Sequence, residues 1–213
     1  MTNSFRIKVK DTIYKKGIFE YSVMEQFYFY HINTLVFRKC LLKDNMAFDE
    51  SLYNCEDSDL ILRLISGNEL VFINNYHAIY HQSDDGIYSF IEHTGSIIDE
   101  MKNLDEDCIK KMVRIEINKI RVKFKMLNNF NYDNSIMSYE KFEEYVFDYI
   151  SKKYVFIAYI CSVHMPGDCI LYLEKAIQYC KCAEEKMFLI YLLGDYKNDN
   201  KLMNIDVNHM NHW

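Results

Sequence analysis

The sequence predicts an α/β fold, in which a mixed sheet with helices occupies the first part of the chain and an all-helical C-terminal region follows. Short apolar runs of strand length occur at residues 35–37, 70–73 and 77–80. Between the first two runs, apolar residues recur at helical spacing over residues 57–66. After Ile91 apolar residues repeat every three or four positions, which is typical of helices with one buried face.

The chain divides into three segments, residues 1–30, 31–90 and 91–213. In the first segment, Phe5, Ile7 and Val9 alternate with basic residues, which predicts a short strand with a basic outer face. A loop is expected from Tyr14 to Gly17, followed by an aromatic stretch that is strand or irregular.

The composition is that of a folded chain without a general affinity for nucleic acid. Half of the 213 residues are hydrophobic and 26% are charged, so the chain has enough apolar surface to form a core. The formal net charge of -6 provides no overall basic surface for nucleic acid. The longest apolar stretch, residues 154–163, is too short to cross a bilayer.

Cysteine usage indicates a reducing compartment. The seven cysteines are an odd number and no signal peptide precedes them, so we expect free thiols in a cytoplasmic protein. Cys180 and Cys182 are separated by one residue, which is poor spacing for a zinc site, and no second pair completes one.

The acidic pair Glu56-Asp57 is the main candidate for chemistry. Asn54 is a good N-cap and Gly67 a plausible stop, so the pair is expected in the first turn of a helix that packs on the neighbouring strands. The helix dipole favours carboxylates at that end. A carboxylate held there can accept a proton from a hydroxyl group, whereas the alternative is that Asp57 only caps the helix.

Several motifs around this pair occur in a familiar order. They are Asn33-Thr34-Leu35-Val36-Phe37-Arg38, Phe48-Asp49-Glu50-Ser51-Leu52 preceded by Ala47 where glycine is usual, Glu56-Asp57 with Asp59-Leu60 and Arg63-Leu64, Val71-Phe72-Ile73, Ala78-Ile79-Tyr80-His81, and Ser89. Together they resemble the second, acceptor-side half of the catalytic domain of family 2 glycosyltransferases, which have the GT-A fold. The resemblance covers about sixty residues and implies a partial GT-A-like sheet over residues 31–90.

The resemblance also implies roles for individual residues. In such enzymes a sugar passes from a nucleotide-diphosphate donor to an acceptor hydroxyl with inversion, so Asp57 would be the general base and Glu56 would help to shape the acceptor site. Arg63 and His81 would bind substrate near the diphosphate. The alternatives are an ion pair between Arg63 and Asp59, and a partly exposed polar cap at a strand end for His81.

The nucleotide-binding half of such enzymes has no counterpart before His31. That half carries a D-x-D metal motif, and Asp57-Ser58-Asp59 and Asp105-Glu106-Asp107 match its letters only by coincidence. The chain therefore resembles a truncated enzyme. A partner would have to supply the nucleotide-binding half, and manganese or magnesium would be needed only with it. The rival hypothesis is a non-catalytic interaction protein that retains part of the glycosyltransferase fold.

The C-terminal segment is expected to begin with a long helix capped by Asp105, with further helices opened by Ser138 and covering residues 170–183. Four basic residues project on one flank of the first helix, namely Lys110, Arg114, Arg121 and Lys125. This flank is either a solvated basic face or a surface for anionic lipid headgroups, which would make the protein membrane-peripheral. Nucleic-acid binding is not expected, because no stacking motif accompanies the charges.

Overall fold

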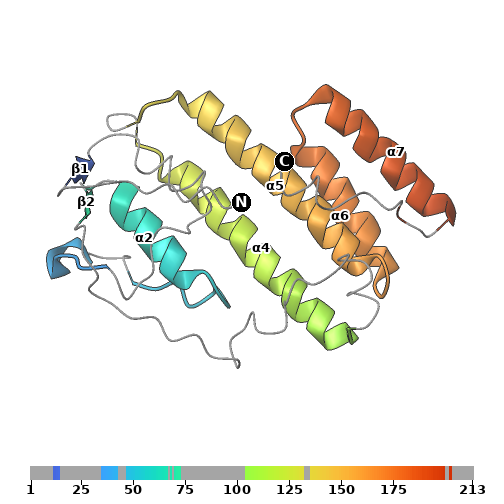
Figure 1. The fold of residues 1–213 in the computed structure, drawn as a ribbon, viewed down its shortest axis with the longest axis horizontal. Helices are drawn as coiled ribbons and strands as arrows, with labels where there is room; N and C mark the ends of the chain where they lie inside the picture. The colour runs from blue at the N-terminus through green and yellow to red at the C-terminus, as the bar shows by residue number, and fades with distance from the viewer. Residues whose placement is uncertain are drawn as a thin grey trace, which may run out of the picture.

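Helices dominate the part of the chain that the structure describes (Figure 1). The computed structural model describes residues 12–14, 35–42, 47–66, 68, 70–72, 104–131, 135–199 and 202. Its elements are β1 (Thr12–Tyr14), η2 (Lys39–Leu41), α2 (Glu56–Ser66), β2 (Leu70–Phe72), α4 (Glu106–Asn128), α5 (Tyr139–Cys161), α6 (Pro166–Tyr179) and α7 (Ala183–Asp199).

The expected GT-A-like mixed sheet is not found in the described residues, so that prediction of the fold class is wrong. Strand pairing there is limited to β1 and β2, which run antiparallel with Thr12 opposite Phe72. Such a two-stranded ribbon is marginal by itself. Residues 35–37, predicted as a strand, are irregular in the structure, and Val36 is 97% exposed. The strand predicted over residues 70–73 is confirmed as β2, whereas Tyr14 ends a strand and does not begin a loop.

Two of the predicted strands, over residues 5–9 and 77–80, lie outside the described residues. Their formation is therefore untested. The helical prediction for the last segment is confirmed over the described part of residues 104–199, in which four helices follow one another.

Helix α2 forms where the spacing of its apolar residues predicted it. Acidic residues occupy its first turn, where they interact favourably with the helix dipole. Its apolar face packs against α4, since Leu62 and Ile65 share a core cluster with Ile109 and Met112. Residues 35–37 are not a strand, so the expectation that α2 packs on strands 35–37 and 70–73 is wrong for the first of them, and for residues 70–73 it stays a prediction.

The start of α2 differs from the predicted cap. The helix begins at Glu56, directly after Cys55, whose φ of 64° lies in the left-handed region. Asn54 is buried and its side-chain oxygen accepts a hydrogen bond from Asn118 of α4, at 3.0 Å. Asn54 therefore joins the approach to α2 with α4 and does not act as the N-cap.

Helices α4 and α5 begin at the predicted caps. The Asp105 carboxylate accepts a hydrogen bond from the Cys108 backbone N–H at 2.7 Å, and the Ser138 hydroxyl accepts one from the Lys141 backbone N–H at 3.3 Å. Helix α6 begins earlier than expected, because Pro166 occupies its first turn, where a missing N–H does no harm. It ends at Tyr179, four residues before the predicted end.

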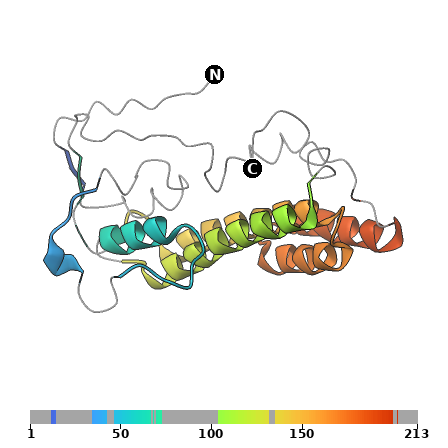
Figure 2. The same cartoon turned by 90° about the horizontal axis from the view of Figure 1, so that it is seen from below.

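The four helices α4 to α7 run alternately in opposite directions (Figure 1) and, seen from the side, form one elongated layer with α2 (Figure 2). Their extensive contacts join neighbours in sequence, α4 with α5, α5 with α6, and α6 with α7. Ser151 of α5 donates to the Ala176 carbonyl of α6 at 2.9 Å, and Tyr196 of α7 donates to the Ser162 carbonyl at 3.1 Å. No helix among the described residues has the length and apolarity that crossing a bilayer requires.

Candidate functional site

The turn before α2 has its own internal bonds. The Asp49 carboxylate accepts a hydrogen bond from the Ser51 backbone N–H at 2.9 Å, and the Leu52 N–H donates to the Asp49 carbonyl at 3.0 Å. At turns, an aspartate carboxylate often accepts a hydrogen bond from the backbone N–H two residues further along the chain. Leu52 is buried in the core, so the turn is anchored at its end.

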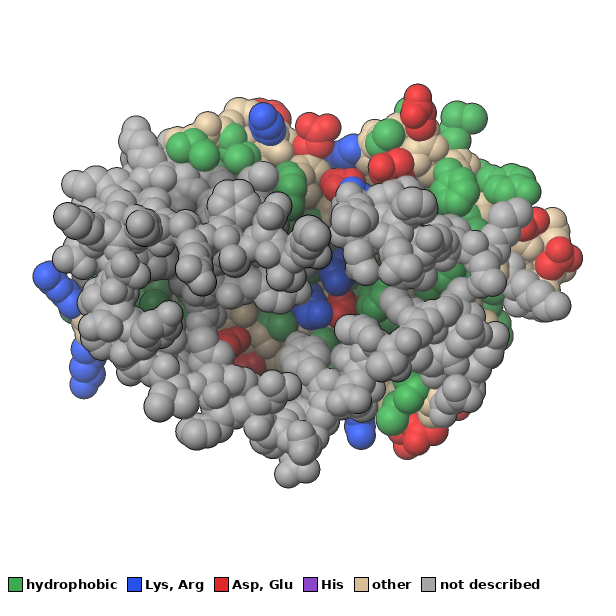
Figure 3. Space-filling view, viewed as in Figure 1, with side chains coloured by type: hydrophobic (Ala, Val, Ile, Leu, Met, Phe, Trp, Pro, Cys, Tyr) green, Lys and Arg blue, Asp and Glu red, His purple; other side chains and the backbone are tan. Residues whose placement is uncertain are grey.

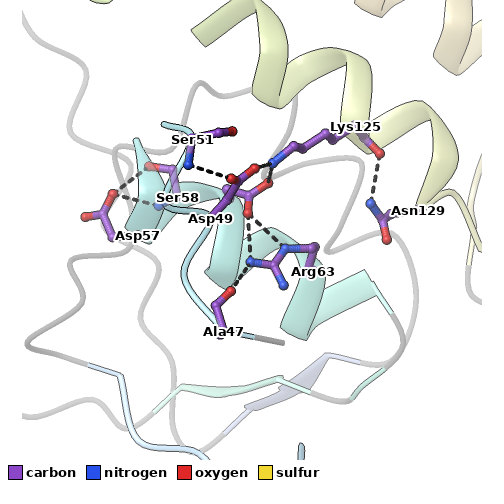
Figure 4. Close-up of polar contacts among 9 residues, drawn as sticks. Ala47, Asp49, Ser51, Asp57, Ser58, Arg63, Lys125 and Asn129 are labelled. Carbon is purple, nitrogen blue, oxygen red and sulfur yellow. Dashed lines mark hydrogen bonds and ion pairs between the residues drawn. The ribbon is translucent and has the colours of Figure 1, made fainter. Parts of the chain in front are cut away.

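A network of charges centred on Asp59 fixes this turn to α2 and α4 (Figure 4). The Asp59 side chain has no exposed surface, and its Oδ2 lies 2.9 Å from Arg63 Nε and 2.7 Å from an Nη atom of the same residue. Its Oδ1 lies 3.2 Å from Lys125 Nζ of α4. Lys125 also pairs with Asp49, and Arg63 donates to the Ala47 carbonyl at 2.8 Å. The buried carboxylate is thus met by two cations.

Glu56 and Asp57 lie outside this network. Glu56 is exposed, and Asp57 is half-buried. Asp57 Oδ1 accepts hydrogen bonds from the Ser58 backbone N–H at 2.6 Å and from the Ser58 hydroxyl at 3.3 Å. Within the described residues neither carboxylate forms an ion pair. Asp57 therefore satisfies one first-turn N–H, as the capping alternative requires, and keeps its second oxygen for other contacts.

The structure tests the predictions for the other two candidate site residues, Arg63 and His81, to different extents. The interpretation of Arg63 as the partner of Asp59 is confirmed by the short contacts between them. A substrate-binding role for Arg63 stays a prediction. His81 lies outside the described residues, so its role also stays a prediction.

Aspartates of both D-x-D sequences bind protein groups in the structure. In the first, Asp59 is held by Arg63 and Lys125. In the second, Asp105 caps α4 and Glu106 pairs with Lys110 at 2.6 Å. The described ranges contain no group of three or more His, Cys, Asp or Glu side chains that could hold a metal ion.

Two of the four basic residues on the flank of α4 have acidic partners in the described residues. Lys110 pairs with Glu106, and the Arg114 guanidinium lies 4.2 Å from the centre of the Tyr53 ring. Arg121 is exposed as predicted. Lys125, expected on the solvated face, pairs with Asp49 and Asp59 in the charge network. These partners favour the interpretation of a solvated, partly paired face, and contact with anionic lipid stays untested.

A second charge cluster on α4 and α5 was not predicted. Glu116 is buried, and its carboxylate oxygens lie 2.5 Å from Lys119 Nζ and 2.9 Å from Lys153 Nζ. Burial opposes its ionisation, but Lys153 and Lys119 outweigh burial and lower the pKa of Glu116. Its partner Lys153 belongs to α5, so spacing along α4 alone did not reveal the cluster.

Lys123 lies in the same part of α4 and has no exposed surface. Its ammonium nitrogen lies 4.4 Å from the centre of the Tyr149 ring. Burial, and to a lesser extent Lys153, lowers the pKa of Lys123 to about 7. A lysine in the middle of an amphipathic helix gives no sequence signal that separates it from exposed lysines.

Comparisons of the chain with protein-family models, with curated proteins and with solved structures found no match. The family resemblance therefore depends on the motif residues themselves.

Proposed function

We propose that this chain takes part in glycosyl transfer, with Asp57 as the general base for an acceptor hydroxyl and Glu56 as a residue that shapes the acceptor site. One observation carries the proposal. Asp49 and Asp59 of the motif stretch are bound to Lys125, whereas Glu56 and Asp57 lie in the first turn of α2 without an ion pair in the described residues.

The proposed chemistry requires one ionised carboxylate. Asp57 would accept the proton of the acceptor hydroxyl while that oxygen attacks the anomeric carbon of the donor sugar. The bond from that carbon to the nucleotide diphosphate breaks, and the configuration inverts. A positioned general base contributes about 10²–10⁴ to such a rate. The Asp59 network supports this role because it holds the turn and the helix start in one arrangement.

The donor site would come from another polypeptide. Holding the donor in position can account for about 7–11 kcal/mol of a barrier, which a single carboxylate cannot replace. A divalent metal, manganese or magnesium, would enter with that polypeptide. Arg63 and His81 are proposed to meet the donor diphosphate, and Arg63 would then share its guanidinium with Asp59.

We place this reaction in the cytoplasm or at the cytoplasmic face of a membrane. All seven cysteines are free in the structure, and free thiols are usual in a reducing compartment. A lipid-linked acceptor would lie at a membrane surface, and the exposed basic residues of α4 that would face it are Lys110, Arg114 and Arg121.

An add-back assay with endogenous acceptors tests the proposed function. Extracts of source cells that lack this chain are supplied with radiolabelled uridine, guanosine and thymidine diphosphate sugars, and transfer of label to endogenous material is measured. Wild-type protein should restore transfer, and Asp57→Asn should restore it about 10²–10⁴ less well. The matched control Asp107→Asn, in the exposed first turn of α4, should act like wild type. Equal restoration by wild type and Asp57→Asn would refute the catalytic role.

The second candidate function is a non-catalytic interaction protein. It is favoured by the exposed apolar side chains of α7, which are of a kind that marks contact surfaces. For this candidate the add-back assay should show no labelled product with any donor, or restoration that is independent of Asp57.

A further inference from the structure

Helix α7 carries a concentration of exposed apolar side chains. Eleven large hydrophobic side chains are exposed in the described residues, and four of them lie within five positions of α7. They are Met187, Phe188, Ile190 and Tyr191, exposed by 73%, 39%, 53% and 56%. In Figure 3 hydrophobic side chains gather at the right of the view, where Figure 1 places α7. At about 100° per residue Phe188 lies on another side of the helix, whereas Met187, Ile190 and Tyr191 lie within about 100° of one another. Exposed apolar side chains gathered on one face in this way mark contact sites.

The two faces of α7 can be assigned from burial. The inner face packs against the rest of the molecule through Leu189, Leu192 and Tyr196. At about 100° per residue, the opposite face is centred on Ala183, Met187, Ile190 and Gly194, with Tyr191 beside them. None of these five residues is charged. A Cβ placed on Gly194 would meet no atom within 4 Å, so another helix can approach closely there.

The charges beside this uncharged stripe are sorted by sign. Glu184 and Asp195 lie on one side of it, and Lys186 and Lys197 lie on the other. Lys197 also pairs with Glu174 of α6 at 3.0 Å, in an exposed contact that a lysine with three donors can share.

The separation of acidic and basic residues on the two sides of the stripe favours a second α7 helix as the partner and favours one relative orientation of the two helices. If two α7 helices run parallel, the acidic side of each meets the basic side of the other. Glu184 then lies near Lys186 of the second copy, and Asp195 near Lys197 of the second copy. If they run antiparallel, Glu184 meets Asp195 and Lys186 meets Lys197, which is repulsive. Like charges of this kind disfavour a pairing, and opposite charges set its orientation.

We propose that the outer face of α7 binds the same face of a second copy of this chain, parallel and across a two-fold axis. The contact is self-complementary, as a two-fold interface requires. It is one helix wide, so it belongs with small, reversible interfaces, and we expect a monomer–dimer equilibrium in the micromolar range. This goes beyond the proposed transferase role, because α7 lies apart from Asp57 and the charge network.

Sedimentation equilibrium of the full chain tests the dimer. The mass of the wild-type chain should rise from 25.6 kDa towards twice that value as its concentration increases. Ile190→Glu and Met187→Glu should remain monomeric, with circular dichroism that shows an unchanged helix content. Leu171→Glu, at an apolar position of α6 that is 43% exposed, is the matched control and should dimerise like wild type. A wild-type chain that stays monomeric at high micromolar concentration would overturn the proposal.

Charge swaps test the orientation. Glu184→Lys with Asp195→Lys should weaken the dimer, and adding Lys186→Glu with Lys197→Glu should restore it, because all four pairs are then reversed. In a background that carries Cys40→Ser and Cys182→Ser, Ala183→Cys should form a disulfide with Ala183→Cys of the second copy under mild oxidation. A mixture of Ala183→Cys and Asn198→Cys should form no mixed disulfide. A mixed disulfide between positions 183 and 198 would mean antiparallel pairing and would refute the parallel arrangement.

Discussion

Lys125 of α4 lies 3.2 Å from a carboxylate oxygen of Asp59 in α2, and that carboxylate has no exposed surface. The contact joins two helices that are remote in sequence. Arg63 is the second cation on the same carboxylate. The position of α2 on α4, and with it the position of the acidic pair, therefore depends on these charges.

Removal of both cations should destabilise the fold. Arg63→Met combined with Lys125→Met leaves Asp59 buried without compensating charge, and we expect a loss of about 3–5 kcal/mol in the free energy of unfolding. Lys125→Met alone should cost less, because Arg63 remains. Adding Asp59→Asn to the double variant should recover part of the loss, since the buried charge is gone. Urea unfolding followed by circular dichroism measures all four proteins.

Lys110→Met is the matched control for this series, because its ion pair with Glu106 is exposed on both sides. The control should unfold at the same urea concentration as wild type. A double variant as stable as the control would show that the Asp59 network does not hold α2.

The isolated chain should bind nucleotide sugars weakly or not at all. The resemblance lacks the half that holds the nucleotide, and the described residues offer no cluster of metal ligands. Calorimetry with uridine, guanosine and thymidine diphosphate sugars, with and without manganese, provides the measurement. Micromolar binding would show that a donor site exists in this chain alone.

Stability should rise with pH because of Lys123. Its pKa is lowered to about 7 in the folded protein by burial, whereas an unfolded chain holds that proton up to about 10.4. Between these values the unfolded state binds more protons, so the free energy of unfolding increases with pH. Below pH 7 both states are protonated and the contribution of Lys123 is constant and unfavourable.

Lys123→Met should remove this dependence. The variant should be more stable than wild type at neutral pH, and its stability should change less between neutral and alkaline pH. Lys111→Met, at an exposed position of the same helix, should keep the wild-type profile. Identical pH profiles of wild type and Lys123→Met would mean that Lys123 is not buried as described.

Buried and exposed cysteines should differ in their reactivity towards maleimide. Burial raises the pKa values of Cys161 and Cys169 to about 12, so their thiolates are scarce at neutral pH. Cys40 and Cys182 are exposed. Maleimide labelling followed by mass spectrometry should modify the exposed pair in the native protein, and the buried pair only in urea. Rapid native labelling of Cys161 would contradict the packing of α5 on α6.

The parts of the structure that depend on local sequence could be predicted. The extent of α2 follows from apolar spacing, and Asp105 and Ser138 cap their helices through contacts three residues away. The ion pair of Arg63 with Asp59 spans one helical turn and was also predicted.

Features that depend on remote contacts could not be predicted. Local sequence favours Asn54 as a helix cap, but its partner Asn118 is 64 residues away. Helical spacing predicts a solvated position for Lys125, but its partner Asp49 is 76 residues away. Val36 has the β propensity of a strand residue, yet a strand also needs a neighbour to complete its hydrogen bonds. The sequence indicates the acidic pair as the candidate site, but it does not reveal that Lys125 of α4 helps to hold the helix that carries the pair.

The sequential packing of α4 to α7 has a consequence for the order of folding. Contacts between neighbouring helices are local and form quickly, whereas the contact of α2 with α4 closes a much longer loop. The helical layer should therefore assemble first and the acidic pair should reach its place last. Pulsed hydrogen exchange during refolding should protect amides of α5 and α6 before those of α2. The region proposed for chemistry would then form after the helical layer and be lost before it.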